Sequence, residues 1–473
     1  MKRRFDVTYL ILAFLAYIIP LSYIVYRTHW VKTADEFDVA ERRLPTTLVF
    51  ASVAATFLGP GYSMGFIGKG FAGGTIWWLM GIVYAIQTVI IGVLIAPRMR
   101  DIPNARTLGG VYGSKTGALS QFVVGMLSVG LCAGFAAVML AAGGKLFVSF
   151  FGWPVWVGVI FTAILTTAYT VTGGLRASVA TDAFQFAIFA ILIPALLVVL
   201  MVQGRIDVTA IGQSGSDLSA EFVRSTGKWG IFALMLSFLV GETMIPPYAS
   251  RALGAKNRQN ARRGFLIAGI FAVIWFLCVV VLGLAARQII DKNSDGDVVL
   301  LNLLQTFPGF MQSFVGIALL GVIMSSLDSL LNSGGVAFSE DVVAIGRQKW
   351  NAGAVTEKTM LVLSRVGIVV ISAVGCIGAL RVQGIVDGLL KCYAMWGPAI
   401  IPSLFYVLLV KRPSSSAAIA SIVTGILVPL GMQLGIFAKD FDPILIGMAC
   451  SVTVLLAAIE PPFGLRHYMK NRK

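Results

Sequence analysis

The chain has 473 residues, of which 57% are hydrophobic and 12% charged, with a mean hydropathy of +0.86. A soluble protein of this length cannot bury that much apolar surface, so the composition excludes a soluble globular protein. The formal net charge of +15 would suit a nucleic-acid-binding protein, but the basic residues lie in alternate loops between apolar segments. We therefore predict an all-α polytopic membrane protein without a nucleic-acid partner.

Apolar runs long enough to cross a bilayer as a helix, about 20 residues each, recur along the whole chain. Span zero is too long for a signal peptide and lacks a small-residue cleavage site, so we expect it to be retained. We predict thirteen spans, numbered zero to twelve, at residues 5–26, 46–67, 75–96, 119–147, 153–172, 177–201, 229–253, 264–286, 309–345, 360–380, 385–410, 417–434 and 443–460.

The basic residues predict the orientation of these spans in the cell membrane. Lysine and arginine cluster in the loops after spans zero, two and six and at 466–473, and the intervening loops carry fewer of them. The positive-inside rule places the basic loops in the cytoplasm, which predicts an outside N-terminus and a cytoplasmic C-terminus. Lys2, Arg3 and Arg4 oppose this orientation, so it follows from the majority of the loops.

The sequence contains no pattern typical of an enzyme. Its five cysteines lie inside spans at irregular spacing, and its two histidines, His29 and His467, lie in loops, so neither predicts a metal site. There is no nucleophile elbow, phosphate loop or HExxH motif. We expect no enzymatic activity and no organic cofactor.

Helix breakers interrupt spans one and six in mid-membrane. Span one reads VAATFLGPGYSMG, with breakers at 59–61, and span six reads FLVGETMIPPYAS, with Gly241 and the pair at 246–247. Proline removes a backbone donor, and unpaired backbone at this depth is tolerated where it lines a cavity or binds a ligand. One break is consistent with a simple kink. Two breaks that open corresponding helices of two five-helix units indicate an inverted-repeat secondary transporter.

These repeats divide the chain into four parts. An extra helix and a cytoplasmic linker occupy 1–45, and the first inverted repeat, spans one to five, occupies 46–201. The second inverted repeat, spans six to ten, occupies 229–410. Two extra helices and a short cytoplasmic tail complete the chain at 411–473.

The segment MSSLDSLLNS, 324–333, places an unusual number of oxygen atoms inside span eight. At 100° per residue its polar residues fall within an arc of roughly 160°. Serine hydroxyls and backbone carbonyls are hard ligands that suit an alkali cation. The alternative is hydrogen bonding between helices, but an aspartate at this depth usually marks an ion path. The polar residues are Ser325, Ser326, Asp328, Ser329, Asn332 and Ser333.

Three stretches resemble signature segments of the sodium/solute symporter family. They are VTGGLRASVATDAFQ at 171–185, SRALGAKNRQNARRG at 250–264 and MSSLDSLLNSGGVAFSEDV at 324–342. The resemblance extends over spans one to ten, and in its first half the chain most resembles the high-affinity choline transporter branch, notably in TFLGPGY and APRMR. It implies the leucine-transporter fold, thirteen helices and solute uptake driven by the sodium gradient.

The resemblance also implies where sodium binds, which is between helices one and eight. Broken helix one would supply exposed carbonyls, and helix eight would supply hydroxyls. The implied ligands are the carbonyls of Ala54, Phe57 and Val322 and the hydroxyls of Ser325 and Ser326.

A second cation site is implied one turn along, at Asp182, Asp328 and Ser329. Two carboxylates placed close together should either bind a cation or share a proton. A shared proton would make the chain a proton-coupled transporter of the same fold. Alternatively, Asp182 is a helix N-cap after the preceding GG turn.

Three aromatic residues resemble members of the choline transporter's ammonium cage. They are Phe57, Tyr84 and Phe135, and the fourth such position holds Ile245. Aromatic faces attract ammonium groups, and Glu242, in the broken part of span six, would add a carboxylate. The alternative is that these aromatic residues are ordinary core residues.

Lys391 is the remaining candidate for contact with the solute. It follows Asp387 by one helical turn, a spacing that suits an ion pair on one helix face. Alternatively, Lys391 faces the cavity and meets a carboxylate of the solute. A zwitterion would satisfy both Lys391 and Glu242.

These observations predict a sodium-coupled symporter that imports a small polar organic solute by alternating access. The solute would be an amine or a zwitterion, such as an amino acid or a choline-like compound. The expected partners are the solute, sodium and the lipid bilayer. A proton-coupled transporter is the first alternative, and a transport-fold solute sensor is the second, although the chain after Glu460 is too short for a signalling domain.

Overall fold

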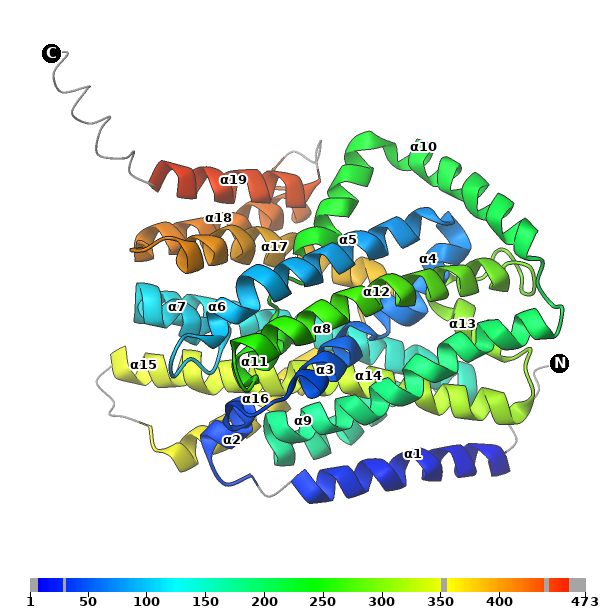
Figure 1. Ribbon diagram of the computed structural model, residues 1–473, viewed down its shortest axis with the longest axis horizontal. Helices are drawn as coiled ribbons and strands as arrows, with labels where there is room; N and C mark the ends of the chain where they lie inside the picture. Colours follow the sequence, from blue (N-terminus) through cyan, green and yellow to red (C-terminus); the bar gives the residue numbers. More distant parts are fainter. Residues whose placement is uncertain (1–6, 29–30, 350–354, 438–441, 459–473) are drawn as a thin grey trace, which may run out of the picture.

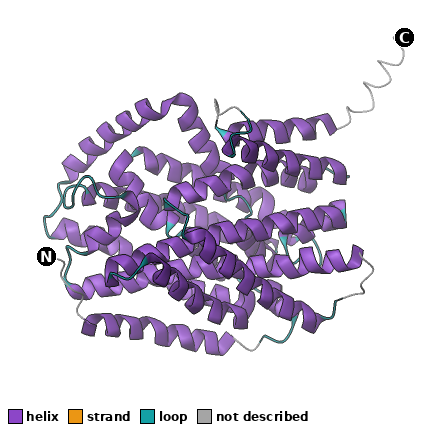
Figure 2. Ribbon diagram, turned by 180° about the vertical axis from the view of Figure 1, so that it is seen from behind, coloured by secondary structure: helices purple, strands orange, loops and turns teal. Residues whose placement is uncertain are grey.

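The computed structural model describes residues 7–28, 31–349, 355–437 and 442–458, and within these ranges it consists of helices joined by short loops (Figure 2). The helices run roughly along one direction, with α1 at one edge of the bundle and α18 and α19 at the opposite edge (Figure 1). The N-terminal residues 1–6, the tail at 459–473 and the loop around His29 lie outside the described residues.

The first half of the chain contains α1 to α9. Its elements are α1 (Val7–Thr28), α2 (Ala34–Val39), η1 (Ala40–Arg42), α3 (Thr46–Phe57), η2 (Gly61–Gly65), α4 (Phe66–Gly73), α5 (Ile76–Ile90), η3 (Ile91–Ile95), α6 (Ala96–Arg100), α7 (Leu108–Thr116), α8 (Ala118–Phe151) and α9 (Val155–Val202).

The second half continues with α10 (Val208–Val240), α11 (Pro246–Gly254), α12 (Arg258–Ala286), η4 (Gly296–Val298), α13 (Val299–Leu304), α14 (Gly309–Ala337), η5 (Phe338–Val343), α15 (Ala344–Lys349), α16 (Glu357–Ala379), α17 (Ile385–Leu409), α18 (Ser415–Gln433) and α19 (Pro443–Ala458).

Polar side chains cap many of the helices where they leave the apolar region. Thr107, Asn257 and Thr356 each accept a hydrogen bond from a backbone N–H in the first turn that follows. These N–H groups have no partner within the helix, so a hydroxyl or amide oxygen at the cap stabilises the helix start.

Within the described residues, nine helices are long and apolar enough to cross a membrane, and a tenth span is added if the bent pair α3 and α4 is counted as one. The predicted number of thirteen is therefore not confirmed, although the described part of each predicted span is largely helical apart from the breaks in spans one and six. Three differences explain the smaller number. Spans four and five follow each other without a loop as the element α9, in which Gly174 (φ 57°, ψ −157°) is non-helical and separates two helices. Span six is divided between α10 and α11, and α19 has only 16 residues.

The predicted loop between spans five and six is also different in the structure. Residues 208–226 form the first part of α10, which bends at Gly227, where φ is 73°. The arc of α10 at the edge of the bundle in Figure 1 results from this bend. No observation tests the boundaries of the two inverted repeats, which stay a prediction.

Helix α14 is the central helix of the bundle. It packs against α1, α3, α8, α9, α11 and α16, and every residue from Ala318 to Ala337 is buried. Its many serines and glycines allow neighbouring backbones to approach closely, as is typical of helix packing in membranes. The polar face predicted for span eight therefore points into the protein and not into lipid.

Candidate functional site

The break in the first broken helix lies directly against α14. Helices α3 and α4 are bent by 61° relative to each other. A Cβ atom added to Gly59 would lie 2.5 Å from Ser326 Oγ, so only glycine permits this approach. Ser326 Oγ donates a hydrogen bond to the carbonyl of Thr56 (3.1 Å), which joins the end of α3 to α14.

The five predicted sodium ligands lie on these two helices. All five are buried; Ser326 lies against the break, and Ser325 points to Asp182 of α9. Ser325 Oγ donates to Asp182 Oδ1 (2.5 Å), and the carbonyl of Ala54 accepts a hydrogen bond from the Leu58 N–H (2.9 Å). The structure thus brings the predicted hydroxyl and carbonyl oxygens into one region. No observation tests sodium binding there.

Asp182, Asp328 and Ser329 also come together, in the same region between α9 and α14. Asp182 Oδ2 accepts hydrogen bonds from Ser52 Oγ (2.5 Å) and Ser329 Oγ (3.4 Å). Asp328 accepts hydrogen bonds from Ser178 Oγ (2.6 Å) and Thr181 Oγ1 (3.3 Å). Asp182 lies in the interior of α9, eight residues beyond the kink at Gly174, and its recorded partners are side chains.

A buried arginine completes this region, and the sequence analysis did not identify it. Arg251 has no exposed surface, and its Nη2 donates to Asp182 Oδ2 (3.0 Å), to Ser329 Oγ (2.5 Å) and to Ser178 Oγ (3.1 Å). Its Nε donates to Ser52 Oγ (2.9 Å). Asp182 therefore already has a positively charged partner. The residues Ser52, Ser178, Asp182, Arg251, Ser325, Asp328 and Ser329 are called the ion region below.

Four tyrosine hydroxyls surround the carboxylate of Glu242, at the break between α10 and α11. Tyr393 donates to Glu242 Oε1 (2.6 Å) and Tyr248 donates to Oε2 (3.0 Å). Tyr62 is hydrogen-bonded to Tyr393 (2.7 Å), and Tyr84 to Tyr248 (2.6 Å). All five residues are buried. They are called the tyrosine cluster below, and only Glu242 and Tyr84 were predicted as site residues.

Further aromatic rings enclose the tyrosine cluster. The ring of Phe57 lies 5.6 Å from that of Tyr84, and the ring of Phe135 lies 5.8 Å from that of Tyr393. Phe57 belongs to α3, whose end also borders the ion region. The structure thus brings together four of the five predicted solute-binding residues: Phe57, Tyr84, Phe135 and Glu242.

Lys391 lies apart from these four residues. Its side chain is exposed and lines a groove of about 720 Å³ with Lys69, Trp77 and Ser237. Asp387, the expected partner of Lys391, is instead paired with Lys69 (3.0 Å). Phe238 separates this groove from the tyrosine cluster, because its ring contacts both Trp77 and Tyr393.

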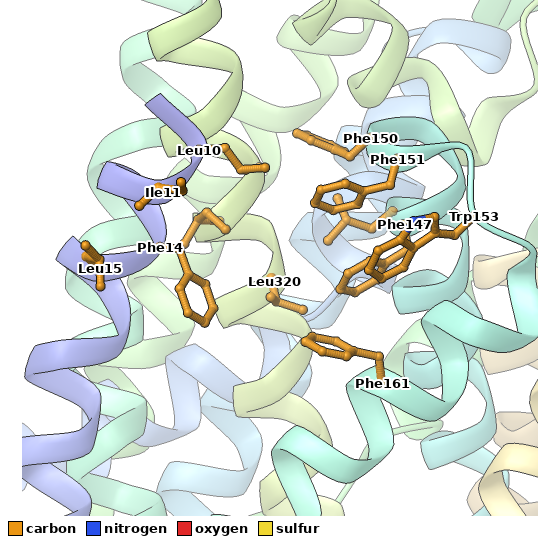
Figure 3. A pocket seen from close by; sticks show the side chains of 13 residues that line it. Leu10, Ile11, Phe14, Leu15, Phe147, Phe150, Phe151, Trp153, Phe161 and Leu320 are labelled. Atoms are coloured by element: carbon orange, nitrogen blue, oxygen red, sulfur yellow. The ribbon is translucent and has the colours of Figure 1, made fainter. Parts of the chain in front are cut away.

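An apolar cavity of about 250 Å³ lies between α1, α8, α9 and α14 (Figure 3). None of its lining residues belongs to the groove at Lys391. Leu10, Phe14 and Leu15 of α1 face Phe147 and Trp153 across the cavity (Figure 3). Apolar side chains and one glycine line the cavity, so it does not suit a polar solute.

The chain is similar to known sodium-coupled transporters over most of its length. Residues 37–425 match the profile of the sodium:solute symporter family. The chain is 24% identical to high-affinity choline transporter 1 of Caenorhabditis elegans, an alignment that covers 84% of this chain and 71% of that protein. It is 23% identical to sodium/proline symporter 2 of Staphylococcus saprophyticus, over 92% of this chain and 88% of that one.

A solved structure agrees with the match to the family. A Na⁺-coupled sialic acid symporter, in a substrate-bound outward-open state, superposes with a TM-score of 0.81 at 18% identity, over 95% of this chain and 96% of that one. This similarity establishes the leucine-transporter fold. The profile match covers most of the chain, so the chain belongs to the sodium:solute symporter family.

Proposed function

We propose that this sodium-coupled symporter carries a solute with a positively charged nitrogen, and that the tyrosine cluster binds that nitrogen. The observation behind this proposal is the buried carboxylate of Glu242, whose side-chain hydrogen-bond partners within the described ranges are tyrosine hydroxyls. Burying an ionised carboxylate is costly unless a cation pairs with it or a proton neutralises it. An ammonium group between Glu242 and the aromatic rings would supply this charge and gain cation–π attraction.

The main sodium site of this proposal is formed by Ala54, Phe57, Val322, Ser325 and Ser326. Phe57 belongs to this set, and its ring contacts Tyr84 of the tyrosine cluster (5.6 Å). Sodium that orders the end of α3 would therefore also order one wall of the solute site. Coupling of this kind is reciprocal, so sodium should tighten solute binding by the same factor as solute tightens sodium binding.

The relatives' names support an amine without identifying it. Choline and proline, named in two relatives, both carry a positive nitrogen. Glucose, named in a third relative, sodium/glucose cotransporter 1 of Sus scrofa, carries none. Lys391 lines a separate groove, so we assign it no direct contact with a solute that is bound at Glu242.

We also propose the orientation predicted from the basic loops. Arg42, Arg106 and Lys256 lie at the end of the bundle where the linker containing α2 packs, and Arg100 donates to the backbone of Lys256 (3.0 Å) at the same end. This linker end would face the cytoplasm. The N-terminus would then lie outside the cell.

Uptake into proteoliposomes of choline, proline, glucose and 3,3-dimethylbutan-1-ol, the uncharged carbon analogue of choline, tests the proposal. We expect sodium-dependent uptake of a cationic or zwitterionic amine and none of dimethylbutanol. Replacing external sodium by potassium at constant pH should abolish uptake. Uptake driven by a pH gradient in potassium would instead establish the proton-coupled alternative. Sodium-driven uptake of glucose alone would refute the amine assignment.

A further inference from the structure

Arg251 donates hydrogen bonds to oxygen atoms that a second cation would need as ligands. Its guanidinium donates to Asp182 and Ser329, two of the three residues of the predicted second cation site. It also donates to Ser178 (3.1 Å), whose hydroxyl in turn donates to Asp328 (2.6 Å). A sodium ion bound directly to Asp182 and Ser329 would compete with these hydrogen bonds, because oxygen atoms that accept them have fewer lone pairs free for a metal.

The charges of the ion region lead to the same conclusion. Asp182 and Asp328 are fully buried, and Arg251 is the basic residue that the structure places against them. With both carboxylates ionised, the net charge is therefore −1, which a single sodium ion at Ser325 and Ser326 would neutralise. A second sodium would leave an unbalanced buried positive charge, and such a charge is costly. The second ion is favoured only if Arg251 withdraws.

Arg251 lies on an element that can move relative to its partners. It belongs to α11, which is joined to α10 by the five non-helical residues 241–245. Its partners Asp182 and Ser329 lie on the long helices α9 and α14. Residues between half-helices are where backbone dihedrals change in hinge motions.

We propose that Arg251 is a tethered cation that competes with sodium for Asp182. The structure then represents the arginine-bound form, and sodium binding at Asp182 displaces the guanidinium. The competition keeps sodium affinity low enough for the ion to leave again, since departure of sodium is compensated by return of the arginine. This inference rests on the proposed sodium coupling. Arg251 acts here as a positioning residue.

The test compares Arg251→Gln with the parent in sodium-dependent uptake and in equilibrium binding of ²²Na⁺. Without the competing guanidinium, the sodium ion at Asp182 should bind half-maximally at a concentration at least about tenfold lower, because the attraction between two opposite charges this close exceeds that factor inside a protein. The maximal uptake rate should fall, because tightly bound sodium leaves slowly. Arg258→Gln is the matched control, since Arg258 pairs with Asp101 at the surface, and it should change neither quantity.

A second measurement separates competition from a general effect of charge. Arg251→Ala leaves space for a free guanidinium, so added methylguanidinium should raise the sodium concentration needed for half-maximal binding in proportion to its own concentration. It should leave the maximal amount of bound sodium unchanged. The parent and Arg258→Gln should not respond to methylguanidinium. Absence of this competition in Arg251→Ala would overturn the proposal.

Equal or weaker sodium binding by Arg251→Gln would also overturn it. If Arg251→Gln fails to fold, Arg251→Lys is measured in its place, because lysine keeps the charge but lacks the planar fork that spans Asp182 and Ser329. Sodium affinity should then rise about threefold, and an unchanged or lower affinity would be contrary evidence. If the parent protein itself bound no sodium, the proposed function would be refuted. That result is distinguishable from the outcomes above, in which the parent binds sodium and only the role of Arg251 fails.

Discussion

The ion region and the tyrosine cluster each bury carboxylates, but their partners differ. Asp182 is paired with Arg251 (3.0 Å) and surrounded by serine hydroxyls. Glu242 accepts hydrogen bonds from tyrosines, and the ion pairs among the described residues do not include it. One region therefore carries its own cation, and the other does not.

This difference supports the proposal of a different ligand for each region. The ion region has its arginine, so a further cation there must be small and exchangeable, and the surrounding oxygens are of the type that suits sodium. The tyrosine cluster lacks a cation, and its walls are aromatic, which suits an organic ammonium group. The comparison thus separates the two positively charged ligands by the chemistry of their surroundings.

The largest expected effect is that of Glu242→Gln on a cationic solute. If the carboxylate neutralises the ammonium group, choline should bind more weakly by about 100-fold or more, because breaking a buried ion pair costs about 3–5 kcal/mol. Binding of 3,3-dimethylbutan-1-ol should change by less than about threefold. Isothermal titration in saturating sodium measures both ligands. Glu221→Gln, at an exposed position of α10, is the control. Equal weakening of both ligands would mean that Glu242 is structural.

Ser326→Ala should act on sodium more strongly than on the fold. The hydroxyl is one of about five proposed ligands, so the sodium concentration that gives half-maximal thermal stabilisation should rise about tenfold. Ser313→Ala is a close control, because Ser313 is buried on the same helix and its hydroxyl has no recorded hydrogen-bond partner. If both substitutions shift the sodium dependence equally, the ligand assignment of Ser326 is wrong.

Tyr393→Phe should have a smaller effect on the solute. It removes one hydrogen bond to Glu242 (2.6 Å) but keeps the aromatic ring. We expect a change in choline affinity of about fivefold, which corresponds to about 1 kcal/mol. Tyr112→Phe provides the comparison, since Tyr112 is an equally buried tyrosine that is hydrogen-bonded to Ser403 (2.8 Å), away from the cluster. A loss of melting temperature without loss of affinity is expected there.

The smallest effect concerns a further buried carboxyl group, that of Asp38 in the linker, outside the membrane spans. Burial, with the nearby charge of Glu340, raises the pKa of Asp38 well above its usual value, although Arg106 opposes the shift. A carboxyl with a raised pKa stabilises the folded protein fully below its usual pKa, and this contribution is lost as pH rises through the folded pKa. The melting temperature should therefore decline with rising pH more in the parent than in Asp38→Asn.

The half-exposed neighbour Asp35, which also contacts Arg106 (3.7 Å), provides the control for this measurement. Asp35→Asn should keep the pH dependence of the parent. An identical pH dependence in the parent and in Asp38→Asn would show that Asp38 is not protonated in the folded protein.

The sequence predicted the helices and both breaks because these follow from local chemistry. An apolar run of about 20 residues has few alternatives to a membrane helix, and consecutive helix breakers, as at 59–61 and 246–247, interrupt a helix where the single prolines Pro20 and Pro194 do not. The number of spans was less predictable. Whether 153–172 and 177–201 are one helix or two depends on the conformation of Gly174, and an isolated sequence does not specify that conformation.

The residues that contact the predicted site residues could not be predicted from the sequence, for a different reason. Arg251 follows Asp182 by 69 residues and precedes Ser329 by 78, so no helical periodicity relates them. The four tyrosines come from α5, α11, α17 and the segment after the first break, and each alone resembles an ordinary core residue. The second break pointed to Glu242, and the position of Tyr62 directly after the first break is a local signal that could have identified it as well.

Helix α1 lies at the edge of the bundle (Figure 1), yet its Tyr17 contacts residues that neighbour the ion region. The Tyr17 hydroxyl accepts a hydrogen bond from Gln185 (2.6 Å) and donates to the sulfur of Met324 (3.9 Å), the residue before Ser325. Its ring also covers Gly321, where an added Cβ would lie 2.9 Å from it. A shortened chain that begins at α3 would therefore expose to lipid the polar side chain of Gln185 and also Gly321 of α14. Helix α1, predicted to lie outside both repeats, is thus part of the smallest unit that we expect to fold and transport.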